Sequence, residues 1–199
     1  MTRIELSAQD AYSVASLMHL TSKDTDQLSA VMLRTFRNNT TAIATDRYLI
    51  GTLRVDSVGE DSPKDYGLTV EACKFITANA KPKRGTESNT VVIELDPENS
   101  KVTITIGASA HSDTYPKKLF EMDKLIDLID AWQPLETAVP VNLSIKLFEQ
   151  LAKLRDGFNK PDAWKLELGA NQRSKQMSGP IRAIVAERFT VLMQPRHLK

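Results

Sequence analysis

Within the first 55 positions, the spacing of the apolar residues changes from helical to strand-like. Ser7 stands where a helix cap is expected, after a short strand at 3–6, and Asp10 follows it at the distance of a capping box. The apolar stripe of the helix consists of Tyr12, Val14, Ala15, Leu17 and Met18. Alternating positions predict strands over 28–36, 41–45 and 49–55, with a turn at Asn38-Asn39. This order is a strand–helix–strands unit.

The same order returns after Gly67. Thr69 is the expected helix cap, and Glu71 lies in the first turn, where the helix dipole favours an acid. Phe75 and Ile76 are expected to face inward. The helix ends at 81–85, and the strands of this unit are expected over 91–95 and 102–106, joined by a turn at 96–99.

A charged connector over 116–138, with a short amphipathic piece at 119–132, precedes a third unit. The third unit begins with a strand at 139–143, and Ser144 is expected to cap its helix. The apolar stripe of this helix is Leu147, Phe148, Leu151 and Leu154. The last strands are expected over 164–168, 180–185 and 189–193.

A repeated strand–helix–strands unit predicts a modular α+β fold. It divides the chain into a complete two-unit domain at 1–115, the connector at 116–138 and a half-domain at 139–199. A generic α+β domain explains the periodicity equally well.

Composition adds little basic character to this picture. The 199 residues are 41% hydrophobic and 26% charged, with a net charge of +1. There is no global basic field of the kind that marks a nucleic-acid binder, so any DNA contact must come from local clustering. A neutral protein that never touches nucleic acid remains an alternative.

Several classes of site and compartment are not indicated. Cys73 is the single cysteine, and the histidines at 19, 111 and 197 are scattered, so neither a disulfide nor a zinc site nor any other cofactor is expected. The N-terminus has no apolar signal region, and no apolar run approaches the roughly 20 residues that a membrane span needs. We therefore expect a cytoplasmic protein.

Catalytic signatures are also not visible. The sequence has no Gly-x-Gly-x-x-Gly, no His-Glu-x-x-His and no recognisable Ser/His/Asp arrangement. Scattered acids such as Asp46 and Asp113 do not make an active site, so we expect a non-catalytic protein. An enzyme is the least favoured alternative.

Two apolar strands end abruptly in polar turns that contain arginine, at 44–50 (Ala-Thr-Asp-Arg-Tyr-Leu-Ile) and at 188–198. Together with Tyr115-Pro116 and the strand-to-helix segment 141–144, they resemble bacterial sliding clamps, the β subunit of DNA polymerase III. Residues 1 to about 115 are similar to the middle domain of that family, and 139–199 to the second half of its last domain. The family's first domain has no counterpart, in keeping with a shortened and divergent member from a phage or mobile element. Leu49 replaces a family arginine, and the tail has a displaced proline and an added His197.

The resemblance implies a DNA-clamp architecture, with antiparallel sheets outside and helices on the inner face. It also implies a pocket for short peptides that contain Gln, Leu and Phe. The matching pocket positions are Leu28, Thr45, Arg47, Tyr48, Ile50, Asn142, Ile145, Val191, Met193, Pro195 and Arg196. The positions that would contact DNA are Lys23, Lys74, Lys81, Lys83, Arg84, Lys146, Lys153 and Arg155.

By the same resemblance, the expected partners are a DNA polymerase or other replication proteins, a clamp loader, and double-stranded DNA contacted without sequence preference. A homo-oligomer is expected, and if its ring needs about twelve units, as in the family, three units per chain would make four chains. Two alternatives stay open. The chain could be a monomeric module that modulates a host clamp or polymerase without forming a ring. Leu28, Ile50, Val191 and Met193 could be plain core residues, and the lysines solvated helix surface.

Overall fold

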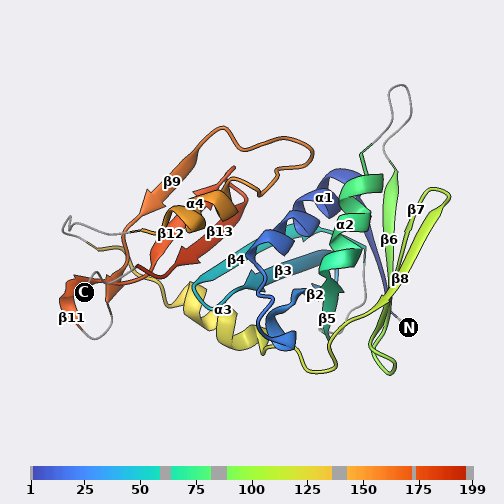
Figure 1. The fold of residues 1–199 in the computed structure, drawn as a ribbon, viewed down its shortest axis with the longest axis horizontal. Helices are drawn as coiled ribbons and strands as arrows, with labels where there is room; N and C mark the ends of the chain where they lie inside the picture. The colour runs from blue at the N-terminus through green and yellow to red at the C-terminus, as the bar shows by residue number, and fades with distance from the viewer. Residues whose placement is uncertain (1, 59–63, 82–88, 136–142, 172–173, 196–199) are drawn as a thin grey trace.

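The computed structural model describes residues 2–58, 64–81, 89–135, 143–171 and 174–195. In this part of the chain, four α-helices combine with antiparallel sheets of four, seven and two strands (Figure 1). The α+β class with antiparallel sheets is confirmed. None of the described helices has the length and apolar character that a membrane span requires.

The four-stranded sheet joins the first unit to the second. Its order is β1 (Thr2–Ser7), β6 (Thr90–Asp96), β7 (Lys101–Ile106) and β8 (Ser109–Thr114). β1, β6 and β7 bury alternate residues, as expected for strands with one face on the core. β8 was not predicted, because none of its side chains is fully buried and its residues are mostly polar.

The seven-stranded sheet continues from the first unit into the third. Its order is β5 (Lys64–Thr69), β2 (Ala30–Phe36), β3 (Asn39–Thr45), β4 (Leu49–Asp56), β13 (Phe189–Met193), β12 (Ile181–Val185) and β9 (Trp164–Glu167). The junction is the antiparallel pair of β4 and β13, in which Leu49 lies opposite Met193. The two-stranded ribbon pairs β10 (Ala170–Asn171) with β11 (Ser174–Ser178).

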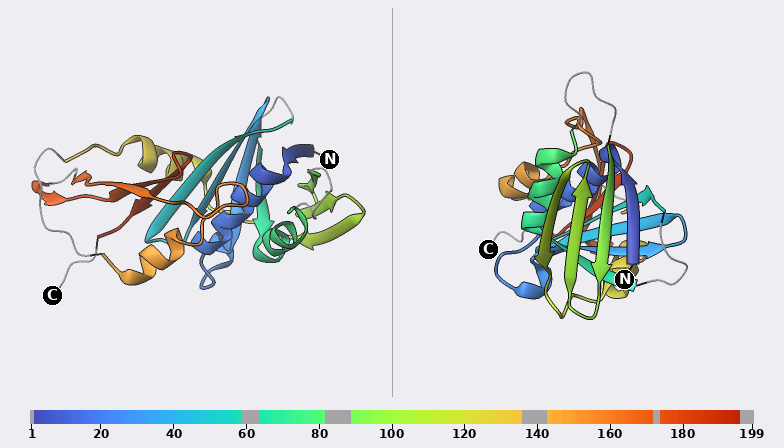
Figure 2. Two further views of the ribbon diagram at one scale, coloured as in Figure 1. Left: turned by 90° about the horizontal axis from the view of Figure 1, so that it is seen from above. Right: turned by 90° about the vertical axis from the view of Figure 1, so that its right-hand side faces the viewer.

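Three helices lie along one side of the molecule. These are α1 (Ala8–Ser16), α2 (Val70–Asn79) and α4 (Ile145–Leu151), while α3 (Met122–Asp130) lies on the opposite side of the seven-stranded sheet (Figure 2). α3 packs Met122 and Leu125 on Met32 and Ile43. It confirms the amphipathic piece expected at 119–132. The Arg34 guanidinium donates hydrogen bonds to the carboxylates of Asp123 in α3 and Asp65 in β5, and these bonds fix the helix to the sheet.

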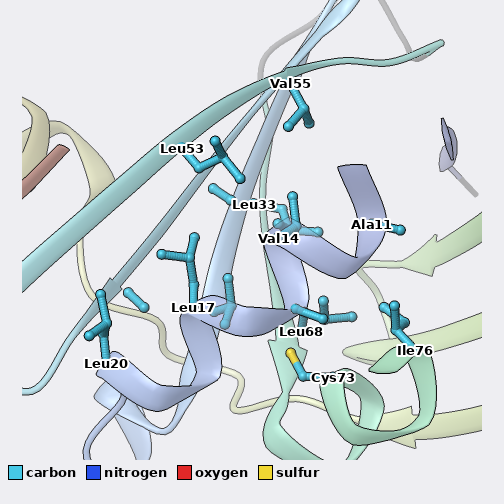
Figure 3. Close-up of a cluster of buried hydrophobic side chains, with 14 of the residues drawn as sticks. Ala11, Val14, Leu17, Leu20, Leu33, Leu53, Val55, Leu68, Cys73 and Ile76 are labelled. Carbon is cyan, nitrogen blue, oxygen red and sulfur yellow. The ribbon is translucent and has the colours of Figure 1, made fainter. Parts of the chain in front are cut away.

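The main core lies between the helices and the sheets. Val14 and Leu17 point toward Leu33 and Leu53 of the seven-stranded sheet, and Leu68 and Cys73 lie beside them (Figure 3). All of these side chains are fully buried. Burial of each large apolar side chain contributes about 1.5–3 kcal/mol. α1 continues into the 3₁₀ helix η1 (Leu17–Leu20), whose Leu20 is also buried.

The predicted caps of the first two helices are confirmed. The Ser7 hydroxyl accepts a hydrogen bond from the Asp10 N–H (3.0 Å), and Thr69 accepts one from the Ala72 N–H (3.0 Å). Ser144 occupies the N-cap position of α4, but its side chain makes no capping hydrogen bond.

Two local predictions were displaced. Phe36 pairs with Asn39, so the hairpin turn is Arg37-Asn38, and the positive φ of 54° falls on Arg37. The strand expected from Leu28 begins at Ala30, because Leu28 ends a short 3₁₀ helix, η2 (Asp26–Leu28).

Candidate functional site

A surface hollow of about 660 Å³ lies where the start of β4 and the end of β13 meet α4. We call it the junction hollow. Its walls come from the loop before β4, from α4 and the turn after it, and from the two residues that follow β13. The lining residues are Asp46, Tyr48, Ser144, Lys146, Leu147, Glu149, Gln150, Lys153, Gln194 and Pro195.

The loop before β4 is held by the carboxylate of Asp46. Its Oδ1 accepts hydrogen bonds from the backbone N–H groups of Tyr48 (2.9 Å) and Leu49 (2.8 Å). Arg47 adopts a φ of 81°, in the left-handed region that costs a non-glycine residue free energy. The carboxylate therefore stabilises a tight turn, the role that fits Asp46 better than catalysis.

The end of β13 is tied to the same loop. The Gln194 N–H donates to the Tyr48 carbonyl (2.9 Å), one residue beyond the Leu49–Met193 pair. Tyr48 stands out from this junction with 65% of its surface exposed, and Pro195 beside it is buried. The two strand ends that the sequence separates by about 145 positions thus meet in one wall of the hollow.

α4 forms the opposite wall. Leu147 and Leu151 pack into the core, and Leu147 also lines the hollow together with Lys146, Glu149 and Gln150. The Gln150 Nε2 donates to the His19 carbonyl (3.2 Å) and to Asp46 Oδ2 (3.1 Å). One side chain therefore links α4 to η1 and to the loop.

The charges around the hollow are mixed. Lys146 and Lys153 line it together with Glu149 and Asp46. The pKa of nearby His19 is lowered, first by burial and then by the positive charges of Lys153 and Arg155. This end of the molecule therefore carries lysine charge beside an imidazole that is neutral at pH 7.

The structure brings only some of the expected pocket residues together. Tyr48 and Pro195 line the hollow, whereas Arg47 and Ile145 are exposed close to it in the sequence, with Ile145 76% exposed. The buried group consists of Leu28, Thr45, Val191 and Met193, and Ile50 is half-buried against the α3 cluster. Asn142 and Arg196 lie outside the described residues.

The expected DNA contacts are also divided. Lys146 and Lys153 line the hollow. Lys23, Lys74 and Lys81 are exposed, and Lys74 is paired with Glu71 (2.7 Å). Arg155 donates to the Ala152 and Leu154 carbonyls at the end of α4. Lys83 and Arg84 lie outside the described residues.

Sequence reasoning did not assign Gln150, Glu149 or Gln194 to the site. The spacing of Lys146, Gln150 and Lys153, four and then three residues apart, places them on one helical face, and this signal was available. Among the described residues, no cluster of His, Cys, Asp or Glu could hold a metal ion. The hollow offers apolar walls, side-chain amide groups and lysines, a combination that suits binding of a ligand with both apolar and polar groups.

Solved structures share this architecture. The β subunit of DNA polymerase III from Thermotoga maritima superimposes with a TM-score of 0.66 at 10% identity, over 100% of this chain and 66% of that chain. A DNA polymerase sliding clamp from Pseudomonas aeruginosa, solved with a ligand, gives 0.60 at 14% identity over 100% and 65%. The β subunit from Borrelia burgdorferi, in complex with a natural product, gives 0.62 at 10% identity over 97% and 64%.

Sequence comparison gives no such match. No protein-family model and no curated protein matches the chain. The chain spans slightly less than two thirds of the length of these clamps. The similarity is therefore one of structure, and it shows that this chain has the sliding-clamp fold.

Proposed function

We propose that this protein is a non-catalytic, sliding-clamp-like processivity factor that holds a short peptide of a DNA polymerase or another replication protein in the junction hollow. The observation that carries the proposal is the meeting of the two strand ends. Tyr48 and Gln194 are hydrogen-bonded (2.9 Å) in one wall of a hollow of about 660 Å³, on a chain with the clamp fold.

The hollow has the chemistry that an extended peptide needs. The Tyr48 ring, Leu147 and Pro195 supply apolar surface, and the side chains of Gln150 and Gln194 supply polar groups. Burial of one Leu or Phe anchor contributes about 1.5–3 kcal/mol. Two anchors and a few hydrogen bonds then give roughly micromolar affinity once the costs of association are subtracted.

A peptide titration tests the proposal. A fluorescein-labelled peptide with Gln, Leu and Phe is titrated with the protein, and we expect a roughly micromolar Kd by fluorescence polarisation. Tyr48→Ala should weaken binding about tenfold, because it removes the most exposed apolar group of the hollow. Phe36→Ala is the matched control, since Phe36 is also an exposed aromatic residue (43%) but does not line the hollow.

The proposal fails if the native protein does not bind the peptide at a concentration of about 100 μM. It also fails if the Tyr48 and Phe36 variants bind it equally well.

A second function is favoured by the charge of the helical side. α1 contains no Lys or Arg, and Lys74 of α2 is paired with Glu71. This supports a monomeric module that binds a replication peptide and modulates a host clamp or polymerase, with no ring and no DNA contact. The processivity factor is favoured if the protein sediments as an oligomer and binds duplex DNA with an affinity that falls steeply as the salt concentration rises. Peptide binding by a monomer that ignores duplex DNA favours the module.

A further inference from the structure

We propose that Gln150 is a positioning residue, which holds Tyr48 at the edge of the junction hollow through its hydrogen bond to Asp46. We call this pair the Asp46–Gln150 clasp. The effect on peptide binding rests on the proposed function, whereas the effect on the loop does not.

Gln150 connects three segments. One amide group donates to the His19 carbonyl of η1 (3.2 Å) and to Asp46 Oδ2 of the loop (3.1 Å). Gln150 is partly buried, so folding removes part of the water around its amide group, and breaking these bonds would leave the two N–H donors incompletely hydrogen-bonded. Within the described part of the chain, no other side-chain hydrogen bond connects α4 to residues 45–49.

Asp46 transmits the position of α4 to Tyr48. While Oδ2 accepts from Gln150, Oδ1 accepts from the N–H groups of Tyr48 (2.9 Å) and Leu49 (2.8 Å). Arg47, between Asp46 and Tyr48, has a φ of 81°, a strained conformation that persists only because the surrounding structure holds it. β13 fixes the carbonyl of Tyr48 and the clasp fixes its N–H, so the residue is held from both sides of the hollow.

The carboxylate at the centre of the clasp makes it sensitive to charge. The ionisable groups on the elements packed around it are those of His19, Lys146, Glu149, Lys153 and Arg155. Gln150→Glu would place a second carboxylate about 3 Å from Asp46, where two negative charges repel until a proton is shared between them. The same substitution changes the shape of the side chain very little.

Two substitutions and a control test the clasp through peptide affinity. Gln150→Glu should weaken binding about tenfold at pH 7.5, and affinity should recover as the pH is lowered to about 5. Adding Asp46→Asn should restore much of the affinity at pH 7.5, because an asparagine amide can donate to the new carboxylate. Gln9→Glu, the same substitution at an exposed residue of α1 that does not line the hollow, should change affinity less than about twofold and show no such recovery.

A second readout does not depend on the peptide. Amide hydrogen exchange of Tyr48 and Leu49, followed by NMR, should speed up about tenfold in Gln150→Glu relative to the native protein at pH 7.5. The double variant should reverse the change. If the native protein binds no peptide but the exchange follows this pattern, the proposed function fails and the clasp stands.

The clasp is overturned if Gln150→Glu exchanges and binds as the native protein does. It is also overturned if its affinity falls without recovery at low pH and without rescue by Asp46→Asn.

Discussion

Gly169→Ala is expected to destabilise the protein strongly, because a methyl group has no room at this position. A Cβ there would lie 2.2 Å from the Pro180 carbonyl oxygen and 2.5 Å from Trp132 Nε1. These two atoms already form a hydrogen bond, in which the indole N–H donates to the carbonyl oxygen at 2.8 Å. The methyl group would therefore press on both partners of a part-buried hydrogen bond.

The structure sets the size of the effect. The Pro180 carbonyl belongs to the backbone just before β12, so it cannot move aside as a flexible side chain could. Overpacking of this kind costs about 1–3 kcal/mol. Loss of the indole bond adds about 1 kcal/mol. The guanidinium of Arg182, 3.9 Å from the centre of the Trp132 ring, loses part of its contact as well. We expect a total of about 2–4 kcal/mol.

Urea unfolding measures this loss. With a slope of about 2 kcal/mol per molar urea, the midpoint should fall by about 1–2 M with the slope unchanged. Gly107→Ala is the control. Its φ is 57°, so alanine is strained there, but the nearest atom to its Cβ is 3.8 Å away. The control should cost only about 1 kcal/mol.

Trp132→Phe separates the two parts of the effect. Alone it removes the indole bond and should cost about 1 kcal/mol. Combined with Gly169→Ala it should cost less than the sum of the single changes, because both remove the same bond. A midpoint for Gly169→Ala no lower than that of Gly107→Ala would refute the argument from the Pro180 carbonyl.

Two further predictions concern backbone strain and pH. Ala186 and Glu187 have φ angles of 51° and 59°, so Glu187→Gly should stabilise the protein by about 0.5–1 kcal/mol and raise its Tm, and an unchanged or lower Tm would contradict this. The pKa of His19 is lowered by burial, then by Lys153 and Arg155, so the unfolded state binds the proton more readily. Its contribution to stability is complete above pH 6.5 and is lost as the pH falls below that value. His19→Asn should flatten the fall in unfolding free energy as the pH drops below about 6.5, and an unchanged slope would count against the assignment.

Helix starts and apolar stripes were predictable because they depend on near neighbours. Ser7 and Thr69 cap the helices that follow them, each through an N–H three residues ahead. The amphipathic α3 was also visible as a periodic pattern within the connector. Such signals need no knowledge of the rest of the fold.

The parts that were missed depend on long-range pairing. β8 carries no apolar alternation, and only its place beside β7 makes it a strand. In the same way, Met193 and Pro195 look alike as candidates for a pocket wall. Both are buried, but Met193 is paired with Leu49 inside the sheet, whereas Pro195 lies beyond the last pair of β13 with β4 and lines the hollow. Sequence spacing alone does not reveal which face of a strand meets the core.

The position of the junction hollow follows from one antiparallel pair. Because β4 and β13 run in opposite directions, the start of one strand lies beside the end of the other, and Leu49 faces Met193. The loop before β4 and the residues after β13 must therefore emerge at the same corner of the sheet. α4 packs Leu147 and Leu151 into the core beside that corner, which places Gln150 within reach of Asp46. A slip of one residue between β4 and β13 would turn Met193 outward and separate Gln194 from Tyr48. The hydrophobic core of the junction and the geometry of the hollow are thus set by the same register.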